Sequence, residues 1–342
     1  MTSARAGSIH LAIVKLSSLG DVIHALPVAR ALKAARPDWR LSWVVEAREA
    51  ALLRGQPGLD AIVVVDTRRW RRLVRSWPGA RQAAREIAAV RRQLVAARFD
   101  VVIDLQGLLK SGALTALTLA PLRIGFAASR CREPLNALFT TRRVLPPPAA
   151  RHIVEQYCAL LAPLDIPPAT PAVEIAIDPI ADGLAQEFLA AAEIKPGDRL
   201  VVLNPGAGLA EKRWPLSHFR QLANQLWGST GARVLVTWGP GEDEPARLLA
   251  AGLVSRPVVA PATDIPTLAA LLRRATVVVG SDTGPVHLAA ALGTPAVGLY
   301  GPTRAERNGP FGPHGTAVQS PDGTMAGITP SAVFAVAVEY LQ

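Results

Sequence analysis

The chain has 342 residues, of which 50% are hydrophobic and 19% charged. This length usually corresponds to two domains, and the ordinary apolar fraction excludes disorder over most of the chain. The two cysteines, Cys131 and Cys158, are distant and form no CxxC pair, so neither a disulfide framework nor a structural zinc site is expected. The first residues show no signal-peptide pattern, and the longest uncharged stretch, residues 283–303, is interrupted by prolines and glycines that disfavour a membrane span.

The formal net charge is +10, and most of it comes from one segment. Residues 68–98 contain ten arginines and a single acidic residue, Glu86. Such a patch attracts polyanions, which include nucleic acid, anionic lipid headgroups and phosphorylated substrates. The alternative is an ordinary solvated helix face.

Strand and helix patterns alternate along both halves of the chain, which is typical of parallel α/β sheets. In the first half, strands are expected at residues 10–16, 41–45, 61–65 and 101–105, and helices at 21–35 and over most of the arginine-rich segment. In the second half, strands are expected at 200–203, 233–237 and 276–279, and helices at 215–227 and 286–292.

The pattern predicts an α/β fold with two Rossmann-like domains. A proline-rich stretch between residues 146 and 175 indicates the region between them. We place the first domain at 1–165 and the second at 166–330. Residues 331–342 are expected to form a C-terminal helix whose apolar face packs back on the first domain.

Ligands of open parallel sheets bind at the carboxyl ends of strands, and the first loop of interest, residues 15–24, follows the first expected strand. Gly20 permits a tight turn and Asp21 lies at the start of a helix. The residues fit both a helix-capping role for Asp21 and a role as general base, and both can hold together. His24 is a weaker candidate, because one turn later it fits a hydrogen-bonded helix residue equally well.

Two further loops join a strand to a helix in the second half. In residues 204–215, glycines and Lys212 suit phosphate binding, although the segment matches neither a Walker loop nor a dinucleotide fingerprint. Residues 280–287 contain Asp282, Thr283 and His287, with Pro285 in the expected first turn of a helix. Exposed amides there suit a pyrophosphate. The alternatives are an ordinary turn in the first loop, and a capped helix with a structural histidine in the second.

Several motifs resemble those of the lipopolysaccharide heptosyltransferases of glycosyltransferase family 9. They are KLSSLGDVIHALP at 15–27, KRWP at 212–215 and SDTGPVHLAAALGTPAVGLYGPT at 281–303. WVVE at 43–46, RRWRR at 68–72, DLQGLLKS at 104–111 and REPLNALF at 132–139 are most similar to the members that add the first heptose, heptosyltransferase I. The resemblance covers nearly the whole chain.

The resemblance implies a GT-B fold, with the active site in a cleft between two Rossmann-like domains. It implies transfer of heptose from ADP-heptose to the Kdo part of the lipid A inner core, with inversion at the anomeric carbon and with neither metal nor cofactor. Asp21 matches the catalytic base, and Lys212 matches a lysine that stabilises the departing ADP. The implied donor-site residues are Ser17, Ser18, Ala207, Gly208, Lys212, Glu242, Thr263, Asp282, Thr283, Gly284 and His287.

The arginine-rich segment then has a specific expected partner. Kdo carboxylates and lipid A phosphates pair well with guanidinium groups, and the implied acceptor-binding residues are Arg68, Arg69, Arg71, Lys110 and Arg132. The remaining arginines favour an anionic membrane surface. We therefore expect a cytoplasmic protein in peripheral contact with the inner membrane and no nucleic-acid partner.

One loop departs from the first-heptose pattern. Ala207 and Gly208 stand in a PGAG turn, more like that of second-heptose enzymes, where first-heptose enzymes often have a threonine pair. A second-heptose transferase or another family 9 enzyme with a different acceptor is therefore the alternative.

An oxidoreductase would need GxGxxG after the first strand, where this chain has SSLGD. A non-enzymatic polyanion-binding protein would explain the charge alone, and aromatic residues, at 5%, offer few stacking platforms for nucleic acid.

Overall fold

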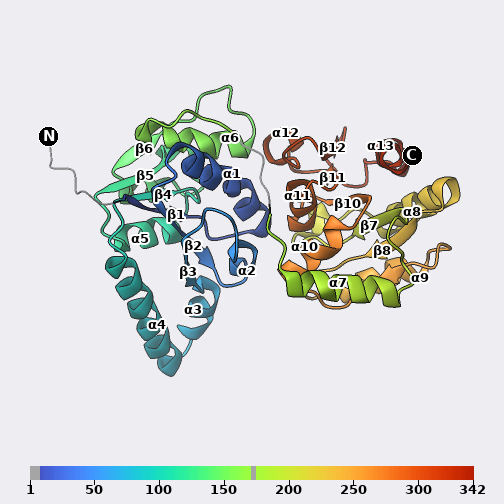
Figure 1. Ribbon diagram of the computed structural model, residues 1–342, viewed down its shortest axis with the longest axis horizontal. Helices are drawn as coiled ribbons and strands as arrows, with labels where there is room; N and C mark the ends of the chain where they lie inside the picture. Colours follow the sequence, from blue (N-terminus) through green and yellow to red (C-terminus); the bar gives the residue numbers. More distant parts are fainter. Residues whose placement is uncertain (1–7, 171–174) are drawn as a thin grey trace. The chain divides into compact units, whose positions relative to one another are not determined.

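The computed structural model describes residues 8–170 and 175–342. The chain divides into two compact units, Met1–Pro171 and Ala172–Gln342, and each contains a six-stranded parallel sheet (Figure 1). The predicted boundary at 165/166 falls six residues earlier, because the chain continues to pack on the first unit: Ile166 is buried. Residues 171–174 of the predicted interdomain stretch lie outside the described residues.

The first sheet has the strand order β3-β2-β1-β4-β5-β6. Its strands are β1 His10–Val14, β2 Arg40–Glu46, β3 Ala61–Val65, β4 Val101–Asp104, β5 Leu122–Phe126 and β6 Arg142–Val144. The central strands β1 and β4 are apolar on both faces, as a parallel sheet covered by helices requires.

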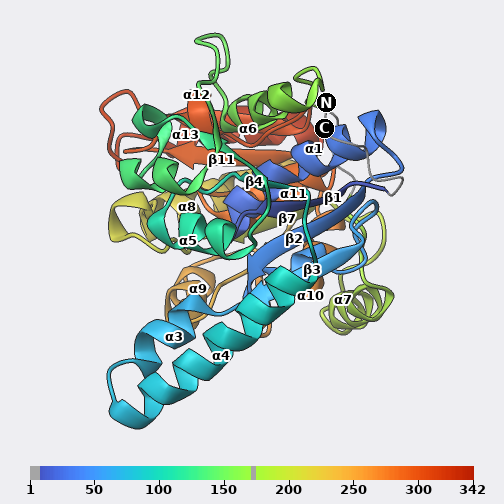
Figure 2. The ribbon, with the colours of Figure 1, turned by 90° about the vertical axis from the view of Figure 1, so that its left-hand side faces the viewer.

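The helices of the first unit are α1 Leu19–Ala35, α2 Ala50–Leu53, α3 Thr67–Leu73, α4 Trp77–Ala96, α5 Leu109–Leu117 and α6 Ile153–Cys158. Short 3-10 turns occur at Ala128–Arg130, Pro134–Phe139 and Ala159–Leu164. Helices α3 and α4 pack together. Figure 2 shows them side by side, with the turn that joins them at the end away from the sheet.

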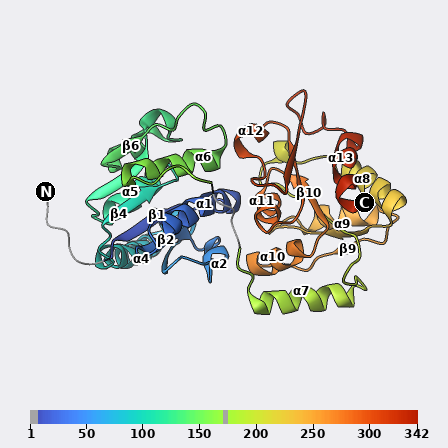
Figure 3. The same ribbon diagram turned by 45° about the horizontal axis from the view of Figure 1, so that its top comes forward.

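The second sheet has the order β12-β11-β10-β7-β8-β9. Its strands are β7 Leu200–Asn204, β8 Arg233–Val236, β9 Val258–Val259, β10 Val277–Ser281, β11 Ala296–Tyr300 and β12 Gly315–Gln319. Its helices are α7 Pro179–Ala191, α8 Leu216–Thr230, α9 Asp243–Ala251, α10 Ile265–Arg273, α11 Gly284–Ala291, α12 Ala305–Asn308 and α13 Pro330–Ala337. There are 3-10 turns at Ala210–Lys212 and Val338–Leu341. Figure 3 shows α7 lying against α10.

Both sheets have the same strand order when their strands are numbered within each unit, 3-2-1-4-5-6. This order is that of a Rossmann sheet, and it reverses between the first and fourth strands. The reversal lies between β1 and β4 in the first unit and between β7 and β10 in the second. Ligands of such sheets bind outside the carboxyl ends of these two strands, so the loops after them are where a site is expected.

The C-terminal helix packs within the second unit, and the expectation that its apolar face packs on the first domain is wrong. Val333, Ala337 and Leu341 recur every four residues and therefore share one face of the helical segment. All three are buried in the core of the second unit, where α13 contacts α8, β11 and β12. The second unit thus completes its own core with the end of the chain.

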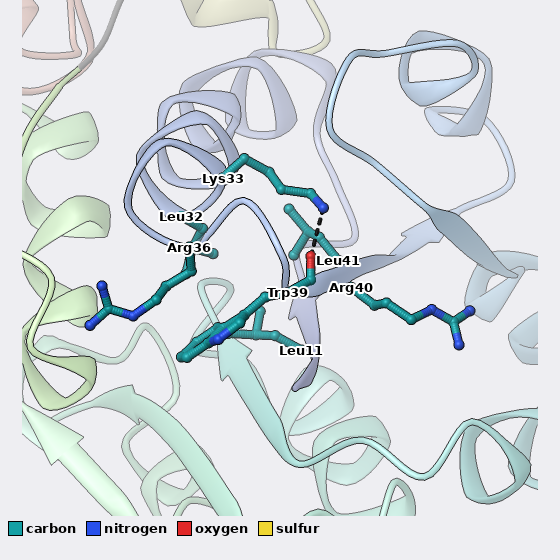
Figure 4. A pocket seen from close by; sticks show the side chains of 7 residues that line it. All are labelled: Leu11, Leu32, Lys33, Arg36, Trp39, Arg40 and Leu41. Carbon is teal, nitrogen blue, oxygen red and sulfur yellow. Dashed lines mark hydrogen bonds between the residues drawn. The ribbon is translucent and has the colours of Figure 1, made fainter. Parts of the chain in front are cut away.

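A small pocket in the first unit lies at the end of the sheet opposite the switch-point loops (Figure 4). Its walls include Leu32, Arg36, Trp39 and Leu41, and Lys33 Nζ donates a hydrogen bond of 2.6 Å to the Trp39 carbonyl oxygen. Leu41 is the second residue of β2. Because substrates of this fold bind at the carboxyl ends of strands, we do not place the active site here.

Candidate active site

Asp21 occupies the first turn of α1, directly after β1. Ser18 is the N-cap residue, and Asp21 Oδ2 accepts hydrogen bonds of 3.0 Å from both the backbone N–H and the hydroxyl of Ser18. This is the reciprocal half of a capping box. The capping interpretation of Asp21 is therefore confirmed, at the third helical position. The Asp21 side chain is nevertheless 43% exposed, so the carboxylate remains accessible to a substrate.

Lys15 is a buried cation beneath this carboxylate, and the sequence reasoning did not single it out. Its Nζ donates to Tyr157 Oη at 2.6 Å and to the Leu105 carbonyl oxygen at 3.2 Å, and it lies 3.7 Å from Asp21 Oδ1. Burial alone lowers the pKa of Lys15, but the oxygen of Tyr157 and the charge of Asp21 outweigh burial, so the pKa is raised. Lys15 therefore stays protonated. A lysine within the apolar strand pattern at 10–16 was the available signal.

The turn between Lys15 and Asp21 is held from the neighbouring strand. Gln106 Oε1, in the loop after β4, accepts hydrogen bonds from the backbone N–H groups of Leu16 and Ser17 at 3.0 and 3.2 Å. The peptide bond between Ser17 and Ser18 is cis. The loops after β1 and β4 are thus tied together at the switch point of the first sheet.

His24 lies one turn after Asp21 and is buried. Its ring packs edge-on against the ring of His152, with 5.2 Å between the centroids. His152 is the N-cap of α6 and accepts a hydrogen bond from the Val154 N–H. The arrangement fits the structural interpretation of His24 better than a role as base.

A buried carboxylate joins two of the family-like motifs. Asp104 is fully buried and accepts hydrogen bonds from the backbone N–H groups of Gln106 and Gly107, from Ser111 Oγ at 2.9 Å and from Asn136 Nδ2 at 2.7 Å. Burial raises the pKa of Asp104, and these four donors oppose the rise. The network connects residues 104–111 with residues 132–139. It therefore fixes the segments that carry Lys110 and Arg132.

Lys110 is held against the start of α3. Its Nζ lies 3.3 Å from Glu46 Oε1 and 3.3 Å from Thr67 Oγ1, and the buried Glu46 also accepts hydrogen bonds from the backbone N–H and the hydroxyl of Thr67. Thr67 is the first residue of α3, which carries Arg68, Arg69 and Arg71. The structure therefore brings Lys110 to the helix that bears three of the predicted acceptor residues.

The predicted acceptor arginines differ in their surroundings. Arg68, Arg69, Arg71 and Arg132 are all exposed. Arg69 forms an ion pair with Glu86 on α4, with 3.2 Å between Nε and Oε1. The backbone of Arg132 passes close to Gly107: a Cβ atom added to Gly107 would lie 3.6 Å from the Arg132 backbone nitrogen.

In the second unit, three predicted donor residues contact one another. Lys212 Nζ lies 2.7 Å from Asp282 Oδ2, and His287 Nε2 lies 3.2 Å from Asp282 Oδ1. Burial would raise the pKa of Asp282, but the hydrogen bonds and charges of His287 and Lys212 lower it to about 2. The loops after β7 and β10 therefore meet at the switch point of the second sheet, with the lysine head held in place.

The other predicted donor residues lie in loops at the same ends of the strands. Glu242 precedes α9 and accepts a hydrogen bond of 3.0 Å from the Gly239 N–H. Its carboxylate packs so closely on Gly206 that a side chain there would collide with it. Ala207 is buried, and its carbonyl oxygen accepts a hydrogen bond of 3.1 Å from Arg213 Nε. The remaining positions are Gly208, which is exposed, Thr263, just before α10, Thr283, the N-cap of α11, and Gly284, the first residue of that helix.

Within residues 8–170 and 175–342, no group of three or more His, Cys, Asp and Glu side chains is arranged to hold a metal ion. Across the same ranges, none of the helices combines the length and the apolarity needed to cross a membrane.

The model of glycosyltransferase family 9 (heptosyltransferase) matches residues 87–329. The chain belongs to glycosyltransferase family 9. It is 34% identical over 327 residues to lipopolysaccharide heptosyltransferase 1 of Salmonella typhimurium, covering 94% of this chain and 98% of the relative. It is 36% identical over 303 residues to lipopolysaccharide heptosyltransferase 1 of Pseudomonas aeruginosa, covering 88% and 81%.

Among solved structures, Escherichia coli heptosyltransferase WaaC with ADP superimposes with a TM-score of 0.81 at 32% identity, covering 97% of this chain and 100% of that chain. This family 9 chain is therefore a glycosyltransferase with the GT-B fold, and the expected fold class and enzyme class are confirmed. An oxidoreductase and a non-enzymatic polyanion-binding protein are excluded as the primary function.

Proposed function

We propose that this glycosyltransferase moves heptose from ADP-heptose to the Kdo part of the lipopolysaccharide inner core, with inversion and with Asp21 as general base. The observation that carries the proposal is the pairing of an accessible carboxylate, Asp21, with a buried cation, Lys15, at the switch point of the first sheet. The relatives named above, and WaaC with ADP-2-deoxy-2-fluoro heptose at a TM-score of 0.78 and 32% identity, support the donor and the sugar.

In the proposed step, the acceptor hydroxyl attacks the anomeric carbon of the donor and its proton passes to an oxygen of Asp21. A new carbon–oxygen bond forms as the bond from the anomeric carbon to the β-phosphate oxygen breaks, and ADP leaves with the electron pair. Attack on the face opposite the leaving group inverts the anomeric centre. Asp21 suits the role because its half-exposed carboxylate is held by Ser18 on one oxygen.

In the same proposal the second unit stabilises the leaving ADP. The ammonium of Lys212, positioned by Asp282 at 2.7 Å, offsets negative charge on the phosphates. The backbone N–H groups of Thr283 and Gly284 stand at the N-terminus of α11, the positive end of the helix dipole. We propose that they stabilise the same phosphates. Neither metal nor cofactor enters this scheme. Glu242 is proposed to hold the donor's ribose.

The acceptor is proposed to bind the first unit. Arg68, Arg71 and Arg132 are exposed cations that suit bidentate pairing with carboxylates and phosphates. Lys110, on α5, contacts Thr67, the first residue of the helix that carries two of them. Since such an acceptor is a membrane lipid, we propose peripheral contact with the cytoplasmic face of the inner membrane.

A second-heptose transferase is the alternative, and one observation favours it. Ala207 is buried and carries no hydroxyl, whereas first-heptose enzymes often have a threonine pair in this loop. Sequence identity favours the first-heptose acceptor: relatives named heptosyltransferase 1 reach 36%, while the solved Escherichia coli ADP-heptose lps heptosyltransferase II is 20% identical.

The test is ADP release from ADP-heptose in the presence of a chelator, with and without Kdo-bearing lipid A. We expect release that depends on the acceptor.

Asp21→Asn should abolish release while leaving donor affinity nearly unchanged, whereas Lys212→Ala should weaken both. The matched control is Asp60→Asn, because Asp60 is a similarly exposed carboxylate, 3.1 Å from a lysine, Lys33, at the other end of the first sheet. A fully active Asp21→Asn enzyme would remove the base from the proposal, and release only with a heptosylated acceptor would favour the alternative.

A further inference from the structure

Helix α4 carries a stripe of arginines on its solvent face that the proposed reaction does not use. The helix buries Ala83 and Leu94 where it packs on β3 and α5. At 3.6 residues per turn, Arg81, Arg85 and Arg92 fall on one line along the opposite side, and all three are exposed. The stripe extends about 16 Å, at 1.5 Å per residue. It is therefore longer than a site for one small anion.

The turn that joins α3 to α4 presents large apolar side chains to solvent. Trp77, the first residue of α4, is 74% exposed, and Val74, the C-cap residue that follows α3, is 56% exposed. The guanidinium of Arg81 lies 5.6 Å from the centre of the Trp77 ring, within cation–π range. Figures 1 and 2 both show this turn at the end of the helix pair away from the sheet.

The stripe is distinct from the arginines proposed to bind the acceptor. Arg132 of the acceptor site precedes the 3-10 turn at Pro134–Phe139, and the other three arginines lie on α3, where Arg69 is paired with Glu86. Glu86 is the single acidic residue in residues 68–98, a segment with ten arginines. The charge on α4 is thus left largely uncompensated within the segment, next to an exposed aromatic residue.

We propose that the helix pair α3–α4, residues 67–96, docks on an anionic phospholipid bilayer. Trp77 and Val74 enter the interfacial layer, where tryptophan is favoured, and Arg81, Arg85 and Arg92 pair with headgroup phosphates. An exposed apolar tip beside a cationic stripe matches a surface that offers both hydrocarbon and phosphate. A nucleic-acid duplex presents phosphates but keeps the faces of its bases stacked inside, so it offers no apolar layer for such a tip to enter. The proposal rests on the proposed function in one respect, that the acceptor is a lipid of the same bilayer.

The first test is co-sedimentation of the full chain with vesicles of phosphatidylglycerol and phosphatidylcholine, compared with vesicles of phosphatidylcholine alone. We expect binding to the anionic vesicles that weakens with added salt. The triple variant Arg81→Gln, Arg85→Gln, Arg92→Gln should bind roughly 100-fold more weakly, since each arginine near an anionic surface contributes about fivefold. The control Arg247→Gln, Arg256→Gln, Arg307→Gln removes the same charge from exposed positions of the second unit and should bind like the unmodified chain.

The second test addresses the apolar tip. Trp77→Gln should weaken vesicle binding about tenfold. Ile180→Gln is its control, because Ile180 is a 76% exposed apolar side chain in the second unit, and this variant should bind normally. Unchanged vesicle binding by Trp77→Gln would remove the tip from the proposal.

Two further measurements separate this inference from the proposed function. The arginine triple variant should release ADP at the normal rate with acceptor dispersed in detergent, and Asp21→Asn should bind vesicles normally. Normal vesicle binding by the triple variant overturns the docking proposal and leaves the transferase proposal intact. Tighter binding to a DNA duplex than to anionic vesicles at equal salt, lost in the same variant, also overturns it and identifies the stripe as a nucleic-acid surface.

Discussion

Lys15 and Asp21 form an ion pair across the boundary between core and solvent. Their Nζ and Oδ1 atoms are 3.7 Å apart, yet the lysine side chain is 3% exposed and the aspartate 43%. The cation cannot turn toward water, because its Nζ also donates to Tyr157 and to the Leu105 carbonyl oxygen. A fixed positive charge therefore lies beneath a carboxylate that is open to solvent, which makes Lys15 a positioning residue in the proposed reaction.

We predict that Lys15→Met lowers kcat roughly tenfold or more, because small displacements of a reacting group are costly. The KM for the donor should stay nearly unchanged, since the donor binds the second unit in our proposal. The fold should also lose some stability, because the Leu105 carbonyl oxygen and the Tyr157 hydroxyl lose the buried ammonium that donates to both, whereas Asp21 is exposed enough to be hydrated without its partner. Initial rates of ADP release and thermal unfolding measure the two effects separately.

The matched control is Lys33→Met, which removes the lysine of the Lys33–Asp60 pair at the other end of the sheet. It should leave kcat intact. Lys15→Met with an unchanged kcat, or with a loss explained entirely by unfolding, would show that the buried lysine has no part in positioning Asp21.

The strands that the sequence predicts consist mainly of apolar residues. The predicted strand at 61–65 coincides with β3, that at 41–45 is one residue shorter than β2 at each end, and that at 101–105 extends one residue beyond β4. Strands β5 and β6 were not predicted, because arginines interrupt both: Arg123 lies within β5, and β6 begins with two arginines. Pairing with neighbouring strands outweighs local pattern there.

The same distinction holds for the site. Asp21, Lys212 and Asp282 lie in the segments that lead from an apolar strand to the next helix, and such segments are visible in the sequence. The importance of Lys15 and Asp104 is not visible in the sequence, because it depends on burial and on partners far along the chain. Lys15 pairs with Tyr157, and Asp104 with Asn136. A charged residue acquires such a role only when the fold brings those partners to it.

Gly206→Ala should weaken ADP binding roughly tenfold, the effect of losing one hydrogen bond to a charged group. A Cβ atom at position 206 would collide with the carboxylate of Glu242, which is held in turn by the Gly239 N–H. The carboxylate must therefore move away from the place where we propose that it holds the ribose. Calorimetric titration with ADP measures the change.

Gly228→Ala is the control, because an added methyl at Gly228 in α8 meets nothing within 4 Å. It should bind ADP normally and gain slight stability, as alanine favours helix over glycine. If Gly206→Ala binds ADP as tightly as the unmodified chain, the position of the Glu242 carboxylate does not matter for the donor.

The depressed pKa of Asp282 makes a prediction about stability against pH. The folded-state pKa is about 2, below the ordinary value of 3.8, so the folded state binds fewer protons than the unfolded state between these values. Such a group stabilises the fold fully above pH 4, and the contribution is lost as pH falls through 2. A difference of nearly two pKa units corresponds to about 2 kcal/mol. Asp282→Asn should therefore lower the free energy of unfolding of the second unit by about 2 kcal/mol at pH 7.

Urea unfolding at pH 7, 5, 4 and 3 checks this. The difference between Asp282→Asn and the unmodified chain should be constant from pH 7 to pH 5 and should shrink below pH 4, because the carboxylate is then protonated in the unfolded chain and, progressively, in the folded one. Asp243→Asn is the control: Asp243 is 43% exposed and pairs with Arg247 at 3.5 Å, and exposed pairs contribute little. A difference for Asp282→Asn that stays constant down to pH 3 would mean that the contacts with Lys212 and His287 do not depress the pKa of Asp282.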